Sequence, residues 1–316
     1  PLLFLIYVND TQETCLSGSD LYIYADDSKL FRYISGENNS LELQSDLNRL
    51  SVWFIKWLLK LNINKCKVVS FGRNVLNAHQ YSIDNIELEH VHHINDLGIT
   101  FDVKLNFSLH ISAKVNKANS ILGIIKRNFR YLSPESFVML YKALVRSHLE
   151  YANAVWCPYK KGDISLLENV QRRATKLITS IKHLTYEDRL KKLKLPTLKY
   201  RRARGDMIEV FKILHGFYDN INNITLTPHV GVATRGNKYK LYQSSVKYDL
   251  RKHFFTTRVV SLWNSLSDDV VDSNTVNCFK GRLDKFWINQ SVLYNWSADF
   301  TGTGNRSLLL TRNILE

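Results

Sequence analysis

The periodicity of the apolar residues changes near residue 104, and this change constrains the fold more than any other feature of the sequence. Before it, apolar and aromatic residues gather in short runs such as LYIYA (21–25) and KLFRYI (29–34), which are typical of β-strands. From residue 108 to residue 214 they recur every three or four positions, as on one face of a helix. The sequence therefore predicts an α+β fold, with strands in the first third and a helical bundle after it.

Several shorter patterns predict individual elements of the first third. Residues 1–9 are apolar and predict the end of a helix. KVVSF (67–71) predicts a short buried strand, and 79–102 predicts a further pair of strands ending at Gly98. Residues 40–61 are predicted to form a helix whose apolar face consists of Leu43, Leu47, Leu50, Phe54 and Leu58.

The rest of the chain divides by composition. Residues 221–250 are polar and predict a linker, whereas 253–266 and 278–287 regain an apolar pattern. The tail TGTGNRSLLL has glycines without the spacing of a phosphate-binding loop, and we expect it to be disordered. We therefore predict three parts: 1–103, a basic helical region 104–220, and 221–316 with a linker and a small C-terminal subdomain.

Positive charge is concentrated in the helical region. The 316 residues carry a formal net charge of +14. Residues 104–212 contain 23 basic and 8 acidic side chains, a net of +15, whereas residues 1–103 have a net of −5. A local excess of this size favours a polyanionic partner such as nucleic acid. The alternative is a well-solvated helical surface.

Composition also bears on the compartment. No apolar run is long enough to span a bilayer, and no signal-peptide pattern opens the chain. The four cysteines are widely scattered without metal-ligand spacing, which is typical of a reduced protein. We expect an intracellular protein of the nucleus, the cytoplasm or both. Because PLLFLIYVND begins within an apolar segment, Pro1 is interpreted as a cut end.

Two adjacent aspartates, Asp26 and Asp27, lie between the first two predicted strands. Asp is common in tight turns, because its side chain hydrogen-bonds nearby N–H groups, so a turn alone explains the pair. The other interpretation is a metal site, because adjacent carboxylates repel each other and Mg²⁺ prefers carboxylate oxygens. Strand alternation predicts that Tyr22, Tyr24 and Asp26 share one face.

YADD between apolar strands resembles the catalytic hairpin of the reverse transcriptases of non-LTR retrotransposons of the Jockey/CR1 type. PLLFLIYVND resembles the segment after their template-gripping motif, and WLLKLNINKCKVVSFG resembles their next palm motif. HINDLGITFD resembles the hairpin at the palm–thumb junction, with Asp96 in the place of the usual Tyr. The resemblance continues beyond the polymerase core in YKALVRSHLEYANAVWCP, LENVQRRATKLI and FTTRVVSLWNSLSDDVV, where Ser267 replaces the usual proline.

The resemblance implies a truncated polymerase palm followed by a helical thumb, and RNA-directed DNA synthesis by two-metal nucleotidyl transfer. Asp26 would be the ligand shared by two Mg²⁺ (or Mn²⁺) ions, and Asp27 the second carboxylate. Lys65 would lie near the incoming triphosphate, although it is equally well explained as a solvated lysine beside a strand. The residues implied at the primer are Tyr24 and Ala25 at its terminus and Leu97 and Gly98 at its grip.

The implied partners are an RNA template, a DNA primer and deoxynucleoside triphosphates, with no membrane. RRATK (172–176) and KKLKLPTLKYRRAR (191–204) would contact phosphates. The residues expected at this surface are Arg172, Arg173, Lys176, Lys191, Lys192, Arg201 and Arg202. A solvated helix face is the alternative.

The family has a third metal-binding aspartate and basic fingers upstream of where this sequence starts. Asp10 follows the first helix and Asp20 is predicted to lie in a loop, so neither replaces that aspartate. We therefore expect the chain to be inactive alone, and the resemblance implies upstream fingers, palm and an endonuclease in the full element.

Two other functions remain open: a nucleic-acid-binding remnant without chemistry, and a protein-interaction module. His90, His92 and His93 are clustered, but no Cys or carboxylate at ligand spacing completes a zinc site, which favours a strand or loop surface.

Overall fold

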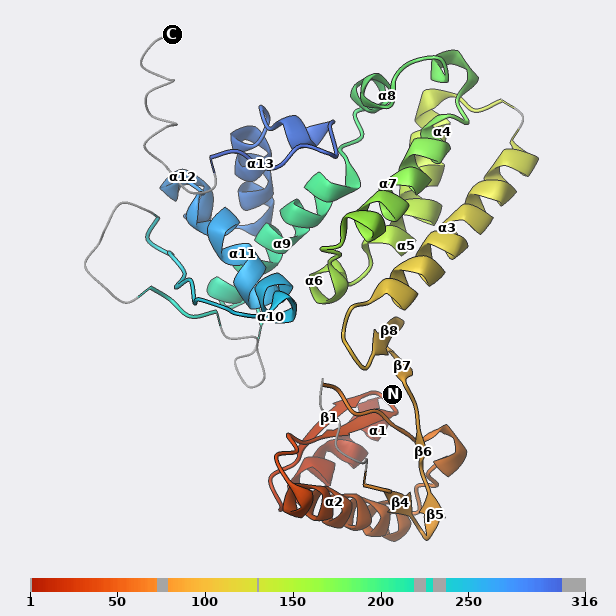
Figure 1. Ribbon diagram of the computed structural model, residues 1–316, viewed down its shortest axis with the longest axis vertical. Coiled ribbons are helices and arrows are strands. Elements are labelled where there is room, and N and C mark those ends of the chain that lie inside the picture. Colours follow the sequence, from red (N-terminus) through yellow and green to blue (C-terminus); the bar gives the residue numbers. More distant parts are fainter. Residues whose placement is uncertain (1, 73–78, 130, 219–225, 230–236, 303–316) are drawn as a thin grey trace. The chain divides into compact units, whose positions relative to one another are not determined.

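The computed structural model describes residues 2–72, 79–129, 131–218, 226–229 and 237–302. The chain forms two compact units, Pro1–Leu105 and Asn106–Glu316. Small sheets occur in the first unit and helices dominate the second, which confirms the predicted α+β class (Figure 1). Within the predicted polar linker 221–250, residues 221–225 and 230–236 lie outside the described residues, as does the predicted tail from residue 303 onward.

The first unit is organised around helix α2 (Glu37–Lys56). Before it come α1 (Leu2–Val8), the 3-10 turn η1 (Asn9–Thr14), β1 (Asp20–Tyr24) and β2 (Asp27–Phe31). After it come η2 (Ile63–Lys65), β3 (Lys67–Val68), β4 (Ser82–Ile83), β5 (Ile86–Glu87), β6 (Glu89–His90), β7 (His93–Asp96) and β8 (Ile99–Asp102). Among the described residues, the strands pair in twos: β1–β2, β4–β5 and β7–β8 are antiparallel hairpins, and β3–β6 is a parallel pair.

The core of the first unit is small. Tyr81, Ile83 and Leu88 are buried, and Leu43 and Leu47 of α2 pack against them. The apolar face predicted for α2 is therefore used over most of its length. A few buried side chains of this kind supply little hydrophobic stabilisation, so polar contacts have a larger share in holding the hairpins in place.

Three predictions for the first unit are wrong in detail. The helix predicted to reach residue 61 ends at Lys56, because Leu58 adopts a positive φ of 57° and is 93% exposed instead of completing the apolar face. The predicted buried strand 67–71 is only the two-residue β3, in which Lys67 is exposed and Val68 half-buried. Gly98 does not end a strand pair; it lies in the turn between β7 and β8.

The second unit is helical, as predicted. Its first helices are α3 (Ser108–Asn128), α4 (Pro134–Leu140), the π-helical segment η3 (Tyr141–Arg146), α5 (Ser147–Glu150) and α6 (Asn153–Trp156). Then follow α7 (Lys161–Thr175), η4 (Thr179–Ile181), α8 (Tyr186–Leu193) and α9 (Leu198–Leu214). Ser133 caps α4 with Pro134 in its first turn, and Thr185 caps α8, since each side chain accepts a hydrogen bond from a backbone N–H.

The remaining helices follow, and all of them except α10 contribute buried side chains to one core with α9. They are α10 (Asp249–His253), α11 (Phe255–Asn264), α12 (Asp268–Val271), α13 (Val276–Phe286) and η5 (Ser291–Leu293). Phe211 of α9 stacks on Phe279 of α13 with ring centroids 4.4 Å apart, and Trp263 of α11 is fully buried beside them. Helices α3, α5 and α7 pack together in a separate group of the same unit, where Ile111, Leu149 and Leu167 are fully buried (Figure 1).

Candidate active site and basic surface

The two aspartates lie at the tip of the β1–β2 hairpin. Tyr24 pairs with Asp27, which leaves Ala25 and Asp26 as a two-residue turn. Ala25 has a φ of 54°, whereas Asp26 is not among the residues with positive φ. A positive φ at the first central position alone is the pattern of a type II′ turn, which usually has Gly there. Both carboxylates are exposed.

The register of the hairpin corrects the predicted arrangement of the face. Residues that pair across two strands share a face, so Tyr22, Tyr24, Asp27 and Lys29 lie on one side. Asp26 was predicted to join Tyr24 on that face, but it belongs to the turn, where strand alternation no longer applies. Asp27 is the carboxylate directly opposite Tyr24, and Tyr24 is 64% exposed.

A second hairpin contacts the first. Leu97 and Gly98 form the turn between β7 and β8, and both have positive φ, 45° and 79°, as in a type I′ turn. Lys29 Nζ lies 2.5 Å from Asp96 Oδ2, immediately before this turn. The structure therefore brings the aspartate-bearing hairpin together with the hairpin that carries Leu97 and Gly98. Apart from the unusual acidic residue at position 96, no pattern in the sequence indicates this ion pair.

Lys65 is not joined to this arrangement. It is the last residue of η2 and is exposed, and its side chain makes no hydrogen bond or ion pair with another described residue. The structure thus gives Lys65 no contact with either aspartate.

Asp20 was predicted to lie in a loop, but it is the first residue of β1 and pairs with Phe31. It remains unsuitable as a third ligand, because it lies at the far end of β1, whose five residues separate it from the turn by roughly 13 Å. Asp10 lies in η1. Within the described ranges, no group of three His, Cys, Asp or Glu side chains is arranged to hold a metal ion.

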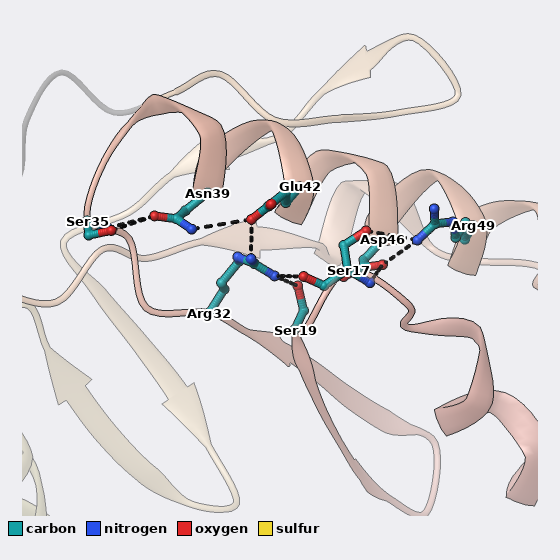
Figure 2. Close-up of polar contacts among 8 residues, drawn as sticks. All are labelled: Ser17, Ser19, Arg32, Ser35, Asn39, Glu42, Asp46 and Arg49. Atoms are coloured by element: carbon teal, nitrogen blue, oxygen red, sulfur yellow. Dashed lines mark hydrogen bonds and ion pairs between the residues drawn. The ribbon is translucent and has the colours of Figure 1, made fainter.

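The base of the β1–β2 hairpin is fastened to α2 by a polar cluster (Figure 2). Arg32, which directly follows β2, donates to the backbone carbonyl of Ser17 and to the Glu42 carboxylate. Asp46 Oδ1 accepts from the Ser17 backbone N–H and from Arg49, both at 3.0 Å. The side chain of Asp46 is fully buried. Burial by itself raises the pKa of this carboxyl, but hydrogen bonds from Ser19 and Ser17 outweigh it and hold the pKa below its usual value.

Sequence reasoning missed this cluster, although a signal exists. Asp46 lies three residues after Leu43 and four before Leu50, within the apolar face of α2. A charged residue on such a face is expected to have buried partners.

Three arginines predicted to bind nucleic acid are engaged inside the second unit. Arg201 makes a bidentate ion pair with Glu150. The guanidinium of Arg172 lies over the rings of Tyr186 and Trp296, at 5.2 and 5.6 Å from their centroids. Arg202 is only 4% exposed. In this structure, the charged groups of these three arginines therefore have internal partners or are buried.

The other predicted basic residues are on the surface. Arg173, Lys176 and Lys192 are exposed, and none of them forms an ion pair with another described residue. Lys191 is also exposed and pairs with Glu187, one turn earlier, at 3.0 Å. Lys182 and Lys194 are exposed in the same stretch, between the end of α7 and the loop after α8.

Two further observations concern the remaining residues. His90 Nε2 lies 3.1 Å from the carbonyl oxygen of His79, a contact that places one histidine of the cluster beside backbone. Among the helices that the structure describes, none has the length and apolar character needed to cross a bilayer.

Comparison with known proteins relates the chain to mobile elements. It is 26% identical over 220 residues to the RNA-directed DNA polymerase from mobile element jockey of Drosophila funebris, which is 67% of this chain and 23% of that protein. The protein of the same name from Drosophila melanogaster is 25% identical over 266 residues, 80% of this chain and 28% of the relative. An uncharacterized protein of Caenorhabditis elegans is 29% identical over 128 residues, 40% of this chain and 65% of the relative.

The chain spans about a quarter of the length of the two jockey polymerases that it matches. No protein-family model and no solved structure matches it. Because two jockey polymerases match two thirds or more of its residues, the chain is related to the RNA-directed DNA polymerases, or reverse transcriptases, of jockey-type non-LTR retrotransposons.

Proposed function

We propose that this chain contributes part of the active site of a reverse transcriptase, with Asp26 and Asp27 as ligands of the Mg²⁺ (or Mn²⁺) ions that nucleotidyl transfer uses. One observation carries the proposal: two adjacent, exposed carboxylates lie at the tip of a tight hairpin in a chain related to jockey polymerases. A turn that needed only a polar residue would not require both.

The donor set suits a hard divalent cation. Mg²⁺ in enzymes of nucleotides is commonly held by one or two carboxylates together with substrate phosphates and water, and two carboxylates are what this turn offers. When bound, such ions would increase the acidity of a 3′-hydroxyl and stabilise a leaving pyrophosphate. The aspartates would hold them at a point that solvent and substrate can reach.

The neighbouring residues would then orient the primer. Tyr24 shares a face with Asp27 and is exposed, so its ring can pack beside a base or sugar at the primer end. Ala25 presents only a methyl group beside it. Leu97 and Gly98 would shape the primer grip through their backbone, since their hairpin is linked to the first through Lys29 and Asp96. For Lys65 near the triphosphate, the support is the sequence resemblance alone.

The proposal needs a further acidic ligand. Two carboxylates are the whole donor set at this turn, and Asp20 is too far along β1 to join them. The third ligand would therefore come from residues other than these, and we expect residues 1–316 alone not to extend a primer.

Divalent-ion binding at the turn tests the proposal directly. Mn²⁺ should broaden the amide NMR signals of residues 24–28 in the wild-type chain. In Asp26→Asn and in Asp27→Asn, about tenfold more Mn²⁺ should be needed for the same broadening, because each variant removes one carboxylate ligand. Glu87→Gln is the matched control, since Glu87 is an exposed carboxylate on the β4–β5 hairpin.

One outcome would contradict metal binding at this turn, and another would contradict the expected inactivity of the chain. Broadening that survives both aspartate variants, or that Glu87→Gln reduces equally, would mean non-specific binding of the ion. Separately, Mg²⁺-dependent primer extension by this chain, lost in Asp26→Asn, would overturn the expected inactivity while supporting the catalytic role.

A second candidate is a nucleic-acid-binding remnant without chemistry. It is favoured by the net charge of +15 in residues 104–212 and by the exposed group of Arg173, Lys176, Lys182, Lys192 and Lys194. In this case RNA or duplex binding would depend on salt, and would be unaffected by Asp26→Asn.

A further inference from the structure

The aspartate-bearing hairpin lacks an apolar anchor of its own. None of residues 20–31 is buried; Leu21, Ile23 and Leu30 are half-buried, and Tyr22 and Tyr24 are exposed. An isolated two-stranded hairpin is at best marginally stable in water. Something other than a hydrophobic core must therefore fix the direction of β1–β2 relative to the rest of its unit.

The polar cluster at the base of the hairpin meets that need (Figure 2). Ser19 immediately precedes β1 and Arg32 immediately follows β2. The cluster therefore lies at the open end of the hairpin and contacts the chain beside both strands. Arg32 reaches Ser17 on one side and Glu42 on the other, and Ser17 is held in turn by Asp46 and Arg49. Helix α2 thus contacts the chain at both ends of the hairpin. Asp46 binds Ser17 before β1, and Glu42, one helical turn away, binds Arg32 after β2.

We propose that Asp46 and Arg32 are positioning residues that fix the direction of the Asp26–Asp27 turn. This inference rests on the proposed metal-binding function of that turn. Five residue pairs in register connect the base to the tip, from Asp20↔Phe31 to Tyr24↔Asp27. A strand ladder of this length moves as one piece, so a change of angle at the base displaces the carboxylates at the tip.

The charge of Asp46 is essential to this role. Its side chain has no exposed surface and its oxygen receives N–H groups from both Ser17 and Arg49. A carboxylate accepts such bonds more strongly than an amide does, because charge-assisted hydrogen bonds are roughly twice as strong as neutral ones. The fork of Arg32 is also specific, because two different guanidinium nitrogens donate to Ser17 and Glu42, whereas a lysine has a single nitrogen for both acceptors.

Hydrogen exchange and Mn²⁺ binding together test the inference. Three variants of this chain are compared with wild type: Asp46→Asn, Arg32→Lys, and Glu89→Gln as control. Glu89 forms an ion pair with Lys67 in the same unit but belongs to the β3–β6 pair. We expect about tenfold faster exchange of the hydrogen-bonded amides of residues 20–31 in the first two variants, with α2 unchanged. Mn²⁺ affinity at the turn should fall by about threefold to tenfold, and the control should change neither.

The outcomes separate positioning from mere stability. Unchanged hairpin exchange in both variants overturns the inference. Faster exchange with unchanged Mn²⁺ affinity also overturns it, since the cluster would then stabilise the hairpin without positioning the carboxylates. If Asp46→Asn also accelerates exchange throughout α2, that variant has destabilised the whole unit. The exchange and Mn²⁺ affinity of Arg32→Lys then decide whether the cluster positions the turn.

The proposed function can fail independently. If wild-type chain binds no Mn²⁺ at residues 26 and 27, the metal site is lost as a proposal. If the variants still accelerate hydrogen exchange in the hairpin in that case, the cluster only anchors the hairpin. The inference that it positions a metal site would then be wrong.

Discussion

Lys29 of β2 and Asp96 of β7 form an ion pair with 2.5 Å between Nζ and Oδ2, and this pair joins two hairpins whose own strands do not pair with each other. Both side chains are partly shielded, at 40% and 23% exposure. The contact lies next to the Leu97–Gly98 turn and on the face of β1–β2 that carries Tyr24 and Asp27. It therefore links the two hairpins whose turns are proposed to meet a primer.

The first prediction concerns this pair. Lys29→Glu and Asp96→Lys should each destabilise the first unit, because each places like charges 2.5 Å apart, and the double swap should restore most of the loss. A double-mutant cycle with neutral variants should give a coupling of about 0.2–1 kcal/mol, the usual value for partly exposed pairs. Urea unfolding followed by Trp fluorescence measures it. Equal losses in the swap and the single variants would show that the two residues do not interact.

The second prediction concerns the turn itself. Ala25 has a φ of 54°, a conformation that is strained for any residue with a Cβ. Ala25→Gly should therefore raise the free energy of unfolding by about 0.5–1 kcal/mol, and Ala25→Val should lower it by a similar amount or more. Denaturant unfolding of the first unit measures both. A stabilising valine would show that the turn does not have this backbone geometry.

Local sequence patterns were sufficient to predict structure that depends on a single helix or hairpin. The hairpin around Asp26 and Asp27 and the helical second unit both follow from the spacing of apolar residues. The end of α2 did not, because WLLK at 57–60 contains neither Gly nor Pro to mark it. Leu58 leaves the helix with a positive φ, which no residue preference indicates.

The features that could not be predicted depend on contacts between segments far apart in the sequence. Residue types show that Arg201 is positive, but not that Glu150, 51 residues earlier, holds its guanidinium. The same is true of Lys29 and Asp96, and of Arg32 and Glu42. For Asp46 a signal was present and was missed, because a charge on the apolar face of a helix requires buried partners. Which carboxylate shares a face with Tyr24 depended on the strand register, and regular alternation through the turn assigned it wrongly.

The third prediction concerns pH and the second unit. His110 is 1% exposed and packs against Trp156, with ring centroids 5.2 Å apart. Burial, and secondly the charge of Lys114, lowers the pKa of His110 from 6.5 to about 4. Since the unfolded chain takes up this proton at higher pH than the folded chain, stability should be full above pH 6.5 and fall progressively toward pH 4. The loss should reach about 3 kcal/mol.

His110→Leu provides the comparison for that prediction. The leucine removes the titrating group from the same buried position, so the slope of stability between pH 6.5 and 4 should flatten in chemical unfolding followed at the second unit. An unchanged slope would place the pH dependence in other groups.

The fourth prediction divides the basic residues by their contacts. Lys176→Ala and Lys192→Ala should each weaken RNA binding and reduce the slope of log affinity against log salt by roughly one, as expected when one phosphate contact is lost. Both side chains are exposed without an internal ion pair among the described residues, so neither substitution should change stability much. Filter binding at several salt concentrations measures the slope.

Arg201→Ala is the matched comparison, because it removes a positive charge that already has a partner. Its guanidinium donates two hydrogen bonds to Glu150, so the variant should lose about 1–3 kcal/mol of stability and leave the salt slope unchanged. A slope reduced by Arg201→Ala as much as by Lys176→Ala would mean that the Glu150 pair opens to bind phosphate. The total positive charge of residues 104–212 would then describe the nucleic-acid surface better than the exposed lysines do.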